Sequence, residues 1–346
     1  MNKRLTKLKQ YMQENSLDSL VITDPQNMRY ISSFTGEGYI VISQKKDYIV
    51  TDFRYTEQAA LQTCGFEIYQ ISKLNAKDAF GGFVRTGFED VSISFSQYAA
   101  FTNVFQKLIP IGKTLLEMRS VKEQEEIAAI RIAESIGDKA FSHILDFIKP
   151  GVSERDIALE IEFYMRRNGA ERLSFDTIVA TGAHGAMPHA EPDDRLIQAG
   201  EFVVLDFGCV YKGYSSDMTR TVCVGKATDE MKRVYDTVLR AQMSSLDMLC
   251  RGAIPRDVHN NAQRIIDELY PGAFGHSLGH GVGLDIHEQP SLSPKNDKPL
   301  MSGNVVTVEP GIYLSGFCGV RIEDLVVIDG HNIVNLTHSD KKLIEL

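Results

Sequence analysis

Four acidic residues stand inside or beside apolar runs that have the composition of buried β-strands. A carboxylate in such a run is costly unless it is paired, hydrogen-bonded or bound to a metal ion. The runs span residues 203–208, 216–222, 305–311 and 319–325, and they carry Asp206, Asp217, Glu309 and Glu323. Glycine-containing turns near 212–213 and 315–316 separate them, so each pair of runs predicts a β-hairpin with one acid on each strand. Any fold of this chain must therefore supply partners for these carboxylates.

The two predicted hairpins bring the acids together if they face each other. Four carboxylates at such close range would repel strongly, and two divalent cations would neutralise their charges. For one acid alone, a neighbouring arginine such as Arg220 or Arg321 explains the burial equally well, but for all four together it does not. Helices followed by a hairpin occur twice in this outline, which predicts a duplicated half-domain.

A glycine-rich stretch lies shortly before the second hairpin. Residues 275–287 contain four glycines and the three histidines His276, His280 and His287. Glycines allow the backbone to approach a ligand or cofactor closely, and a neutral imidazole is a common metal ligand. We therefore expect a histidine from this stretch to complete the ligand set of the acids.

The chain changes character near residue 120. Before this point, apolar runs at 19–23, 39–43 and 48–51 alternate with helical stretches at 3–15 and 55–63, which predicts a sheet covered by helices. After it, a long helical pattern follows Ser120, and further helices are expected over 153–169, 229–249 and 256–269. The sequence thus predicts an α/β domain over residues 1–120 and an α+β domain over residues 121–346.

Composition argues against several classes of protein. With 43% hydrophobic residues, 24% charged residues and a net charge of −9, the chain is typical of globular proteins and ill suited to binding nucleic acid or an anionic membrane. No run resembles a spanning helix or a signal peptide, so a cytoplasmic location is expected. The five cysteines are far apart and form no C-x-x-C pair, which argues against a disulfide framework or a zinc knuckle.

The segments that carry chemistry resemble one known family. They are 205–208 with Asp206, 216–221 with Asp217, the histidines His276, His280 and His287, 309–313 with Glu309, and 320–324 with Glu323. Together they resemble the Xaa-Pro peptidases, which include aminopeptidase P and prolidase, and the resemblance covers nearly the whole chain. It implies a creatinase-like N-terminal domain followed by a pita-bread catalytic domain of pseudo-duplicated helices and hairpins.

The resemblance also implies a ligand set. Asp206 would hold one metal ion, while His280 and Glu309 would hold the other. Asp217 and Glu323 would bridge the two ions. Glu309 would in addition act as the general acid/base of the reaction.

Five further side chains receive roles from the same resemblance. His189 and His287 would hydrogen-bond the scissile carbonyl or the tetrahedral intermediate, and His276 would line the same cleft. Arg321 and Thr219 would orient a carboxylate that binds metal.

The implied activity is hydrolysis of the peptide bond in front of proline. Oxygen-rich ligation with one histidine favours Mn²⁺, while Co²⁺, Fe²⁺ and Zn²⁺ are also compatible, and two such ions about 3.5–4 Å apart would activate a water molecule. We expect an Xaa-Pro aminopeptidase that releases the N-terminal residue of short proline-containing peptides; the alternative is an Xaa-Pro dipeptidase, or prolidase. The family further implies a homodimer, in which the N-terminal domain of one subunit frames its neighbour's cleft.

Two remote alternatives come from other functional classes. Residues 275–279 match the G-x-S-x-G pattern of serine hydrolases, with Ser277 as the nucleophile. Helical sequence precedes this match, and glycines with Pro290 follow it, which does not suit a strand, nucleophile and helix in succession. A non-catalytic pita-bread module that binds peptides would have lost ligands, whereas this chain keeps all the expected ones.

Overall fold

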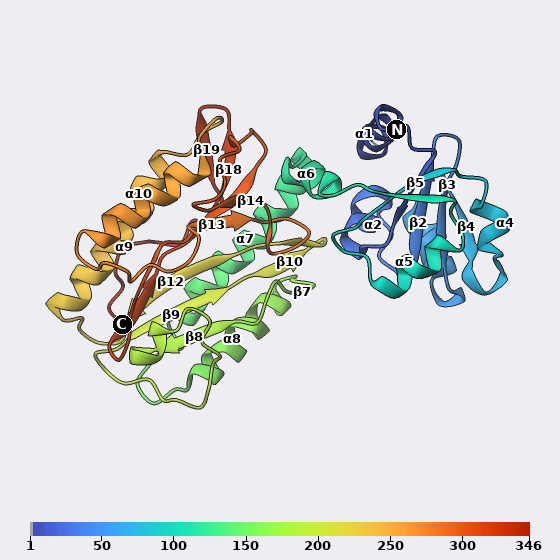
Figure 1. The fold of residues 1–346 in the computed structure, drawn as a ribbon. Helices are drawn as coiled ribbons and strands as arrows, with labels where there is room; N and C mark the ends of the chain where they lie inside the picture. Colours follow the sequence, from blue (N-terminus) through green and yellow to red (C-terminus); the bar gives the residue numbers. More distant parts are fainter. Residues whose placement is uncertain (1–2) are drawn as a thin grey trace. The chain divides into compact units, whose positions relative to one another are not determined.

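The computed structural model describes residues 3–346, which form two compact units (Figure 1). The first unit ends at Arg119 and the second begins at Ser120. Each unit has its own sheets and its own core.

The first unit is a six-stranded sheet with helices. Its strand order is β4-β3-β2-β1-β5-β6, and the β1–β2 and β2–β3 pairs are antiparallel while the other pairs are parallel. The strands are β1 (Ser19–Ile22), β2 (Tyr39–Ser43), β3 (Asp47–Thr51), β4 (Phe66–Gln70), β5 (Arg85–Phe88) and β6 (Lys107–Pro110). The helices are α1 (Lys3–Glu14), α2 (Pro25–Ser32), α3 (Thr56–Gln62), α4 (Ala76–Phe80), α5 (Phe95–Thr102) and α6 (Thr114–Ser120). The predicted α/β sheet is confirmed.

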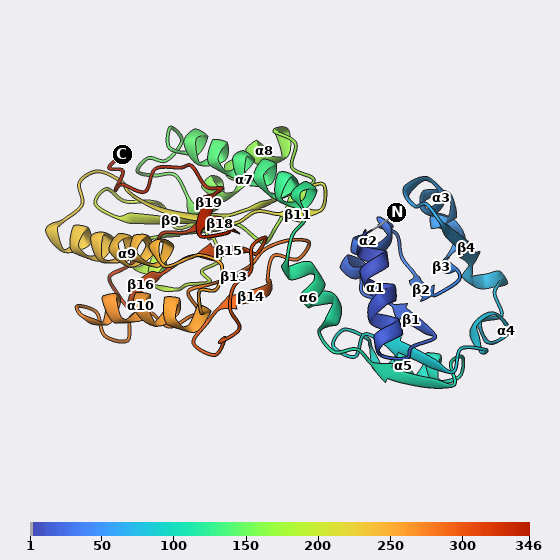
Figure 2. The ribbon, with the colours of Figure 1, turned by 90° about the horizontal axis from the view of Figure 1, so that it is seen from above.

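The second unit places strands between two pairs of helices. Helices α7 (Gln124–Ile144) and α8 (Glu154–Arg167) lie on one side of the strands, and α9 (Asp229–Asp247) and α10 (Pro255–Asp267) lie on the other (Figure 2). α8 begins where the sequence predicted, because the Ser153 hydroxyl accepts a hydrogen bond from the Asp156 N–H at 3.0 Å. One core joins α7 and α8 to the first half of the unit, and a second core joins α9 and α10 to the other half.

The strands of the second unit form four small sheets. The first half contributes β7 (Arg172–Leu173), β8 (Ile178–Thr181), β9 (Phe202–Phe207), β10 (Cys209–Tyr211), β11 (Tyr214–Ser215) and β12 (Met218–Cys223). The second half contributes β13 (Gly279–Gly281), β14 (Glu288–Leu292), β15 (Val305–Val308), β16 (Gly311–Leu314), β17 (Cys318–Arg321), β18 (Asp324–Asp329) and β19 (Asn332–Asn335). The sheet orders are β12-β9-β8, β11-β10-β7, β14-β13-β15-β18-β19 and β16-β17. This is the duplicated arrangement of helices and hairpins that the sequence predicted.

Each predicted hairpin differs from the expectation in one respect, because it is divided into two ladders. β9 pairs with β12 and β10 with β11 in the first hairpin, while β15 pairs with β18 and β16 with β17 in the second. Asp206 lies within β9, but Asp217, Glu309 and Glu323 lie at the breaks between ladders. At a break the backbone leaves the regular ladder, so an acid there is free of the strict alternation of a strand and turns toward the interior of the unit.

The two hairpins meet side to side. The Glu323 N–H donates to the Thr219 carbonyl at 3.1 Å, and the Thr221 hydroxyl donates to the Arg321 carbonyl at 3.0 Å. The Arg321 N–H in turn donates to the Thr221 hydroxyl at 3.2 Å. These bonds hold the acid-bearing strands of one half against those of the other.

Two further expectations concern the whole chain. Among the described residues, none of the helices combines the length and apolar character needed to cross a membrane. The five cysteines are free thiols, of which Cys209, Cys223 and Cys318 are buried.

Candidate metal centre

The acids of both hairpins line one cavity of about 420 Å³ in the second unit. Asp206 and Asp217 reach it from the first half, Glu309 and Glu323 from the second half, and His280 from β13. The structure therefore brings all five candidate ligands of the sequence analysis to one place.

The ligand atoms of these residues lie close to one another. His280 Nε2 is 3.4 Å from Asp217 Oδ2 and 3.4 Å from Glu309 Oε1. One ligand atom from each of Asp217, His280 and Glu323 falls within 4.8 Å of the others. A cation between such atoms would contact oxygen and nitrogen donors at once.

The backbone around His280 fixes the direction of its ring. The Nδ1–H donates to the Gly281 carbonyl at 3.1 Å, which leaves the Nε2 lone pair facing the carboxylates. A Cβ on Gly279 would lie 2.0 Å from the Thr307 carbonyl oxygen, and one on Gly281 would lie 2.4 Å from the Gln289 carbonyl oxygen. The glycines thus let β13 fit between its neighbouring strands, whereas the sequence analysis expected them to admit a ligand.

Hydroxyl and guanidinium groups hold the carboxylates. The Thr219 hydroxyl donates to Glu323 Oε2 at 2.7 Å, and Arg321 Nε donates to the same hydroxyl at 3.1 Å. Arg321 Nη2 also forms an ion pair with Asp206 Oδ2. Thr219 and Arg321 therefore each contact a carboxylate of the expected ligand set.

Two carboxylate oxygens at the centre accept no hydrogen bond from the described residues. Asp206 Oδ1 and Glu323 Oε1 are buried and have no hydrogen-bond partner among residues 3–346. A buried acceptor without a partner is unfavourable by about 1–3 kcal/mol, and more when it is charged. A bound cation would give both atoms a partner, so the donor set fits divalent metal ions.

The pKa values of these groups in the protein without cations also indicate a metal site. Burial, reinforced by neighbouring carboxylates, raises the pKa of Asp217 and of Glu323 well above the ordinary range. Burial raises the pKa of Glu309 to about 8. Burial, with the nearby His287, lowers the pKa of His280 to about 4, so its imidazole is neutral and available as a ligand at neutral pH.

A second chain of polar groups leads away from the carboxylates. Arg321 Nη1 donates to the Tyr313 hydroxyl at 2.8 Å, and that hydroxyl lies 2.9 Å from His276 Nε2. His276 Nδ1 lies 2.8 Å from the Ser277 carbonyl, so Nδ1 carries the proton and Nε2 accepts from Tyr313. Burial lowers the pKa of His276 to about 4, which agrees with this neutral ring.

The two other predicted histidines face the same cavity. His189 and His287 are both among its lining residues, and the His287 ring lies 4.3 Å from the His280 ring between centroids. Both imidazoles therefore lie at the wall of the cavity that the carboxylates also line.

Comparison with known proteins identifies the family. Residues 128–330 match the sequence pattern of metallopeptidase family M24, and residues 4–121 match the creatinase/prolidase N-terminal domain. The chain belongs to metallopeptidase family M24. A Pyrococcus furiosus protein named Xaa-Pro dipeptidase is 36% identical over 358 residues, which cover 99% of this chain and 100% of that one.

Solved structures with similar sequences match the fold over nearly the whole of both chains. A structure named Xaa-Pro dipeptidase from Bacillus anthracis has a TM-score of 0.95 at 40% identity and covers 99% of both chains. A structure named X-Pro aminopeptidase from Thermotoga maritima has a TM-score of 0.92 at 35% identity and covers 99% of this chain and 100% of that one. Membership of this metallopeptidase family implies divalent metal ions.

Three side chains of this M24 centre were missed by the sequence analysis. The Thr307 hydroxyl donates to Glu309 Oε1 at 3.1 Å and accepts from the His280 N–H at 3.1 Å. The fully buried Glu134 accepts from the Asp217 N–H at 3.3 Å, and burial raises its pKa to about 8. The third is Tyr313. Thr307 could have been found from sequence, since it stands two residues before Glu309 on a strand, whereas Glu134 gives no such signal.

The serine-hydrolase alternative does not fit the M24 fold. Ser277 is exposed in a loop, and the segment that follows it is the strand β13 rather than a helix. A nucleophile elbow needs a strand before the serine and a helix after it. The expectation from context is therefore confirmed.

Proposed function

We propose that this protein is an Xaa-Pro dipeptidase that works with two divalent metal ions. The observation that carries the proposal is the convergence of Asp206, Asp217, His280, Glu309 and Glu323 on one cavity. The sequence analysis put an Xaa-Pro aminopeptidase first, but the relatives named Xaa-Pro dipeptidase support its alternative better.

The proposed ligand set is the one that the family resemblance implies, and all five of its residues line the cavity. Asp206 would hold one ion, and His280 with Glu309 would hold the other. Asp217 and Glu323 would be shared by both ions, and the Oε1 of Glu323 has no hydrogen-bond partner among the described residues. The set of four carboxylates and one imidazole favours Mn²⁺ over a thiolate-type zinc site.

Divalent ions in this site would lower the pKa of a water molecule and would stabilise negative charge on the substrate oxygen. Glu309 moves the proton. The Thr307 hydroxyl donates a hydrogen bond to Glu309 Oε1. The other oxygen, Oε2, is then the one that takes a proton from the attacking water and delivers it to the proline nitrogen. His189 and His287 donate hydrogen bonds to the oxygen of the scissile carbonyl.

The cavity also suits a proline ring. Its lining includes the apolar side chains of Phe175, Ile178 and Ile286 beside the acids. A pyrrolidine ring needs apolar contact and offers no amide N–H, so no acceptor is required at that position. A volume of about 420 Å³ lies in the lower part of the range of small-molecule sites, ~300–1,000 Å³, as a dipeptide requires.

Substrate length tests the proposal directly. Purified protein is incubated with Ala-Pro and with Ala-Pro-Ala, in Mn²⁺ and in excess chelator, and released alanine is measured. We expect cleavage of the dipeptide alone, abolished by the chelator. Cleavage of the tripeptide at the Ala-Pro bond would instead support the aminopeptidase, and activity that persists in chelator would refute a metal-dependent peptidase. The homodimer stays a prediction, which sedimentation velocity would check.

A further inference from the structure

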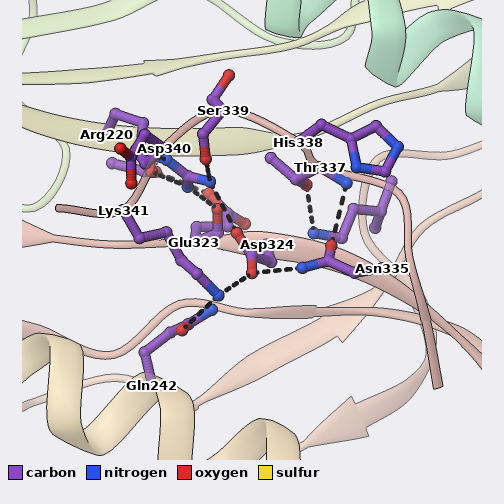
Figure 3. A network of polar contacts seen from close by, with 12 residues as sticks. Arg220, Gln242, Glu323, Asp324, Asn335, Thr337, His338, Ser339, Asp340 and Lys341 are labelled. Carbon is purple, nitrogen blue, oxygen red and sulfur yellow. Dashed lines mark hydrogen bonds and ion pairs between the residues drawn. The ribbon is translucent and has the colours of Figure 1, made fainter. Parts of the chain in front are cut away.

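A short C-terminal segment, residues 337–341, contacts Arg220 and Asp324 (Figure 3). Asp138 in α7 holds it by accepting from the His338 N–H at 3.0 Å and from the Ser339 N–H at 2.7 Å. Arg220 in β12 donates to the Ser339 carbonyl at 2.8 Å and to the Asp340 carbonyl at 3.1 Å. The segment is therefore tied to the same strand that follows Asp217.

Asp324, the residue after Glu323, is fully buried and has a donor on each oxygen. Its Oδ1 accepts from Arg220 Nη2 at 2.8 Å. Its Oδ2 accepts from Lys341 Nζ at 2.6 Å and from Asn335 Nδ2 at 2.7 Å. A buried carboxylate of this kind keeps its place only while its donors are present.

Asp324 and Glu323 are neighbours whose side chains point to different partners. Glu323 faces the Thr219 hydroxyl and the metal cavity, whereas Asp324 faces Arg220 and Lys341. Arg220 Nη1 donates to the Thr219 carbonyl at 2.9 Å and also to the Glu323 carbonyl. One guanidinium therefore binds Asp324 and the backbone on both sides of the Thr219–Glu323 hydrogen bond.

Lys341 is itself held firmly. Its Nζ donates to Gln242 Oε1 at 3.2 Å, and its backbone carbonyl accepts from the Tyr235 hydroxyl at 3.0 Å. Both partners lie on α9. Lys342, the next residue, is exposed and bonds Asp340 only through its backbone N–H. The two neighbouring lysines thus differ in whether the side chain binds Asp324, and this difference can be tested by substitution.

We propose that Lys341 is a positioning residue for the metal-binding carboxylate of Glu323, acting through Asp324 and Arg220. The proposal rests on the metal centre described under the proposed function. Lys341 anchors Asp324 Oδ2 to α9, Asp324 anchors Arg220, and Arg220 fixes the backbone of Glu323 relative to Thr219. The C-terminal segment thereby contributes to metal affinity without touching a metal ion.

The direction of the effect separates positioning from simple charge. Lys341 carries a positive charge, and its removal would strengthen the binding of cations if only long-range repulsion were at work. Loss of positioning weakens binding instead. Partners that orient metal ligands typically change affinity about 10–100-fold, and Lys341 acts at one remove, so we expect a loss of about tenfold.

The experiment titrates full-length, metal-free protein with Co²⁺ and follows its visible absorption. Lys341→Met should bind Co²⁺ about tenfold more weakly than the unmodified protein, with an altered absorption band. Lys341→Arg should restore most of the affinity, because a guanidinium keeps a charged donor beside Asp324. Lys342→Met is the matched control and should bind as the unmodified protein does.

If Lys341→Met folds poorly, Asn335→Ala provides a second test. The Asn335→Ala substitution removes the other donor to Asp324 Oδ2. This variant should also weaken Co²⁺ binding. Unchanged or tighter binding in folded Lys341→Met, or loss of thermal stability alone, would overturn the positioning role. Failure of the unmodified protein to bind two Co²⁺ ions would instead overturn the metal centre itself, so the two ideas fail in different ways.

Discussion

Replacing Thr219 by valine removes one hydroxyl from a carboxylate that lies between the two halves of the catalytic unit. The Thr219 hydroxyl donates to Glu323 Oε2 at 2.7 Å, and the residue is fully buried. Valine has nearly the same shape but no hydroxyl to donate a hydrogen bond. The substitution therefore removes the hydrogen bond to Glu323, together with the one that the hydroxyl accepts from Arg321 Nε at 3.1 Å.

The size of the effect follows from that bond. A hydrogen bond to a charged group contributes about 1.5–3 kcal/mol. Loss of a partner that orients a metal ligand weakens metal binding by ~10–100-fold, which corresponds to ~1.4–2.7 kcal/mol. Since the two ranges overlap, we expect Thr219→Val to raise the Kd for Mn²⁺ by one to two orders of magnitude.

Thr221→Val is the matched control. Thr221 lies on the same strand and is equally buried, but its hydroxyl bonds only the backbone of Arg321 and no carboxylate. Both variants lose a buried hydroxyl, so both should lose fold stability to a similar degree. Only Thr219→Val should lose more metal affinity than its loss of folding stability explains.

The assay is calorimetric titration of metal-free protein with Mn²⁺, accompanied by thermal unfolding in chelator. The reasoning is refuted if Thr219→Val binds Mn²⁺ within twofold of the unmodified protein. It is equally refuted if Thr221→Val loses as much affinity as Thr219→Val, because the hydroxyl on Glu323 would then have no special role.

Three other measurements probe separate parts of the structure. Asp217→Asn should lower metal content and turnover by orders of magnitude, whereas Asp329→Asn, at an exposed strand end, should change neither; normal turnover in the first would disprove the bridging role. Burial lowers the pKa of His276 from 6.5 to about 4, so its contribution to stability is complete above pH 6.5 and lost as pH falls toward 4. Between pH 7 and pH 5, metal-free protein should lose up to about 2 kcal/mol more unfolding free energy than His276→Asn does, measured by urea unfolding; equal losses would contradict the shift. The buried Glu154 accepts from the Thr181 N–H at 2.7 Å and the Asp193 N–H at 3.3 Å, at the two ends of the segment that carries His189. Glu154→Gln should raise KM for Ala-Pro about tenfold with metal content unchanged, and an unaltered KM would show that this segment needs no such anchor.

The acid-bearing strands could be predicted because the signal is local. An acid such as Asp206 inside a run of valine and leucine is visible from a few residues, and the glycine turns after each run fix the hairpin. The division of each hairpin into two ladders has no comparable signal in the sequence. Asp217 and Glu323 stand in the same kind of apolar run as strand residues, and only the structure shows that they lie between ladders. The predicted helix starting at Ser153 was accurate for the same local reason, a capping serine.

Long-range partners escaped the sequence analysis. Glu134 lies 83 residues before Asp217, and Lys341 lies 17 residues after Asp324 with a turn and a strand between them. Neither spacing corresponds to a helix turn or a strand alternation, so no periodicity reports the contact. The preference for an aminopeptidase failed to gain support for a related reason, because substrate length depends on the shape of the whole cleft rather than on its ligands.

Each of the two duplicated halves contributes an arginine that binds residues of the other half. Arg220 belongs to the first half and binds Asp324 and the Glu323 carbonyl in the second. Arg321 belongs to the second half and binds Asp206 and the Thr219 hydroxyl in the first. Each half therefore holds the carboxylates of the other, and neither half alone can present a complete ligand set. Since a divalent ion bound between Asp217 and Glu323 would add a further link across the same junction, metal binding and the docking of the two halves are expected to stabilise each other.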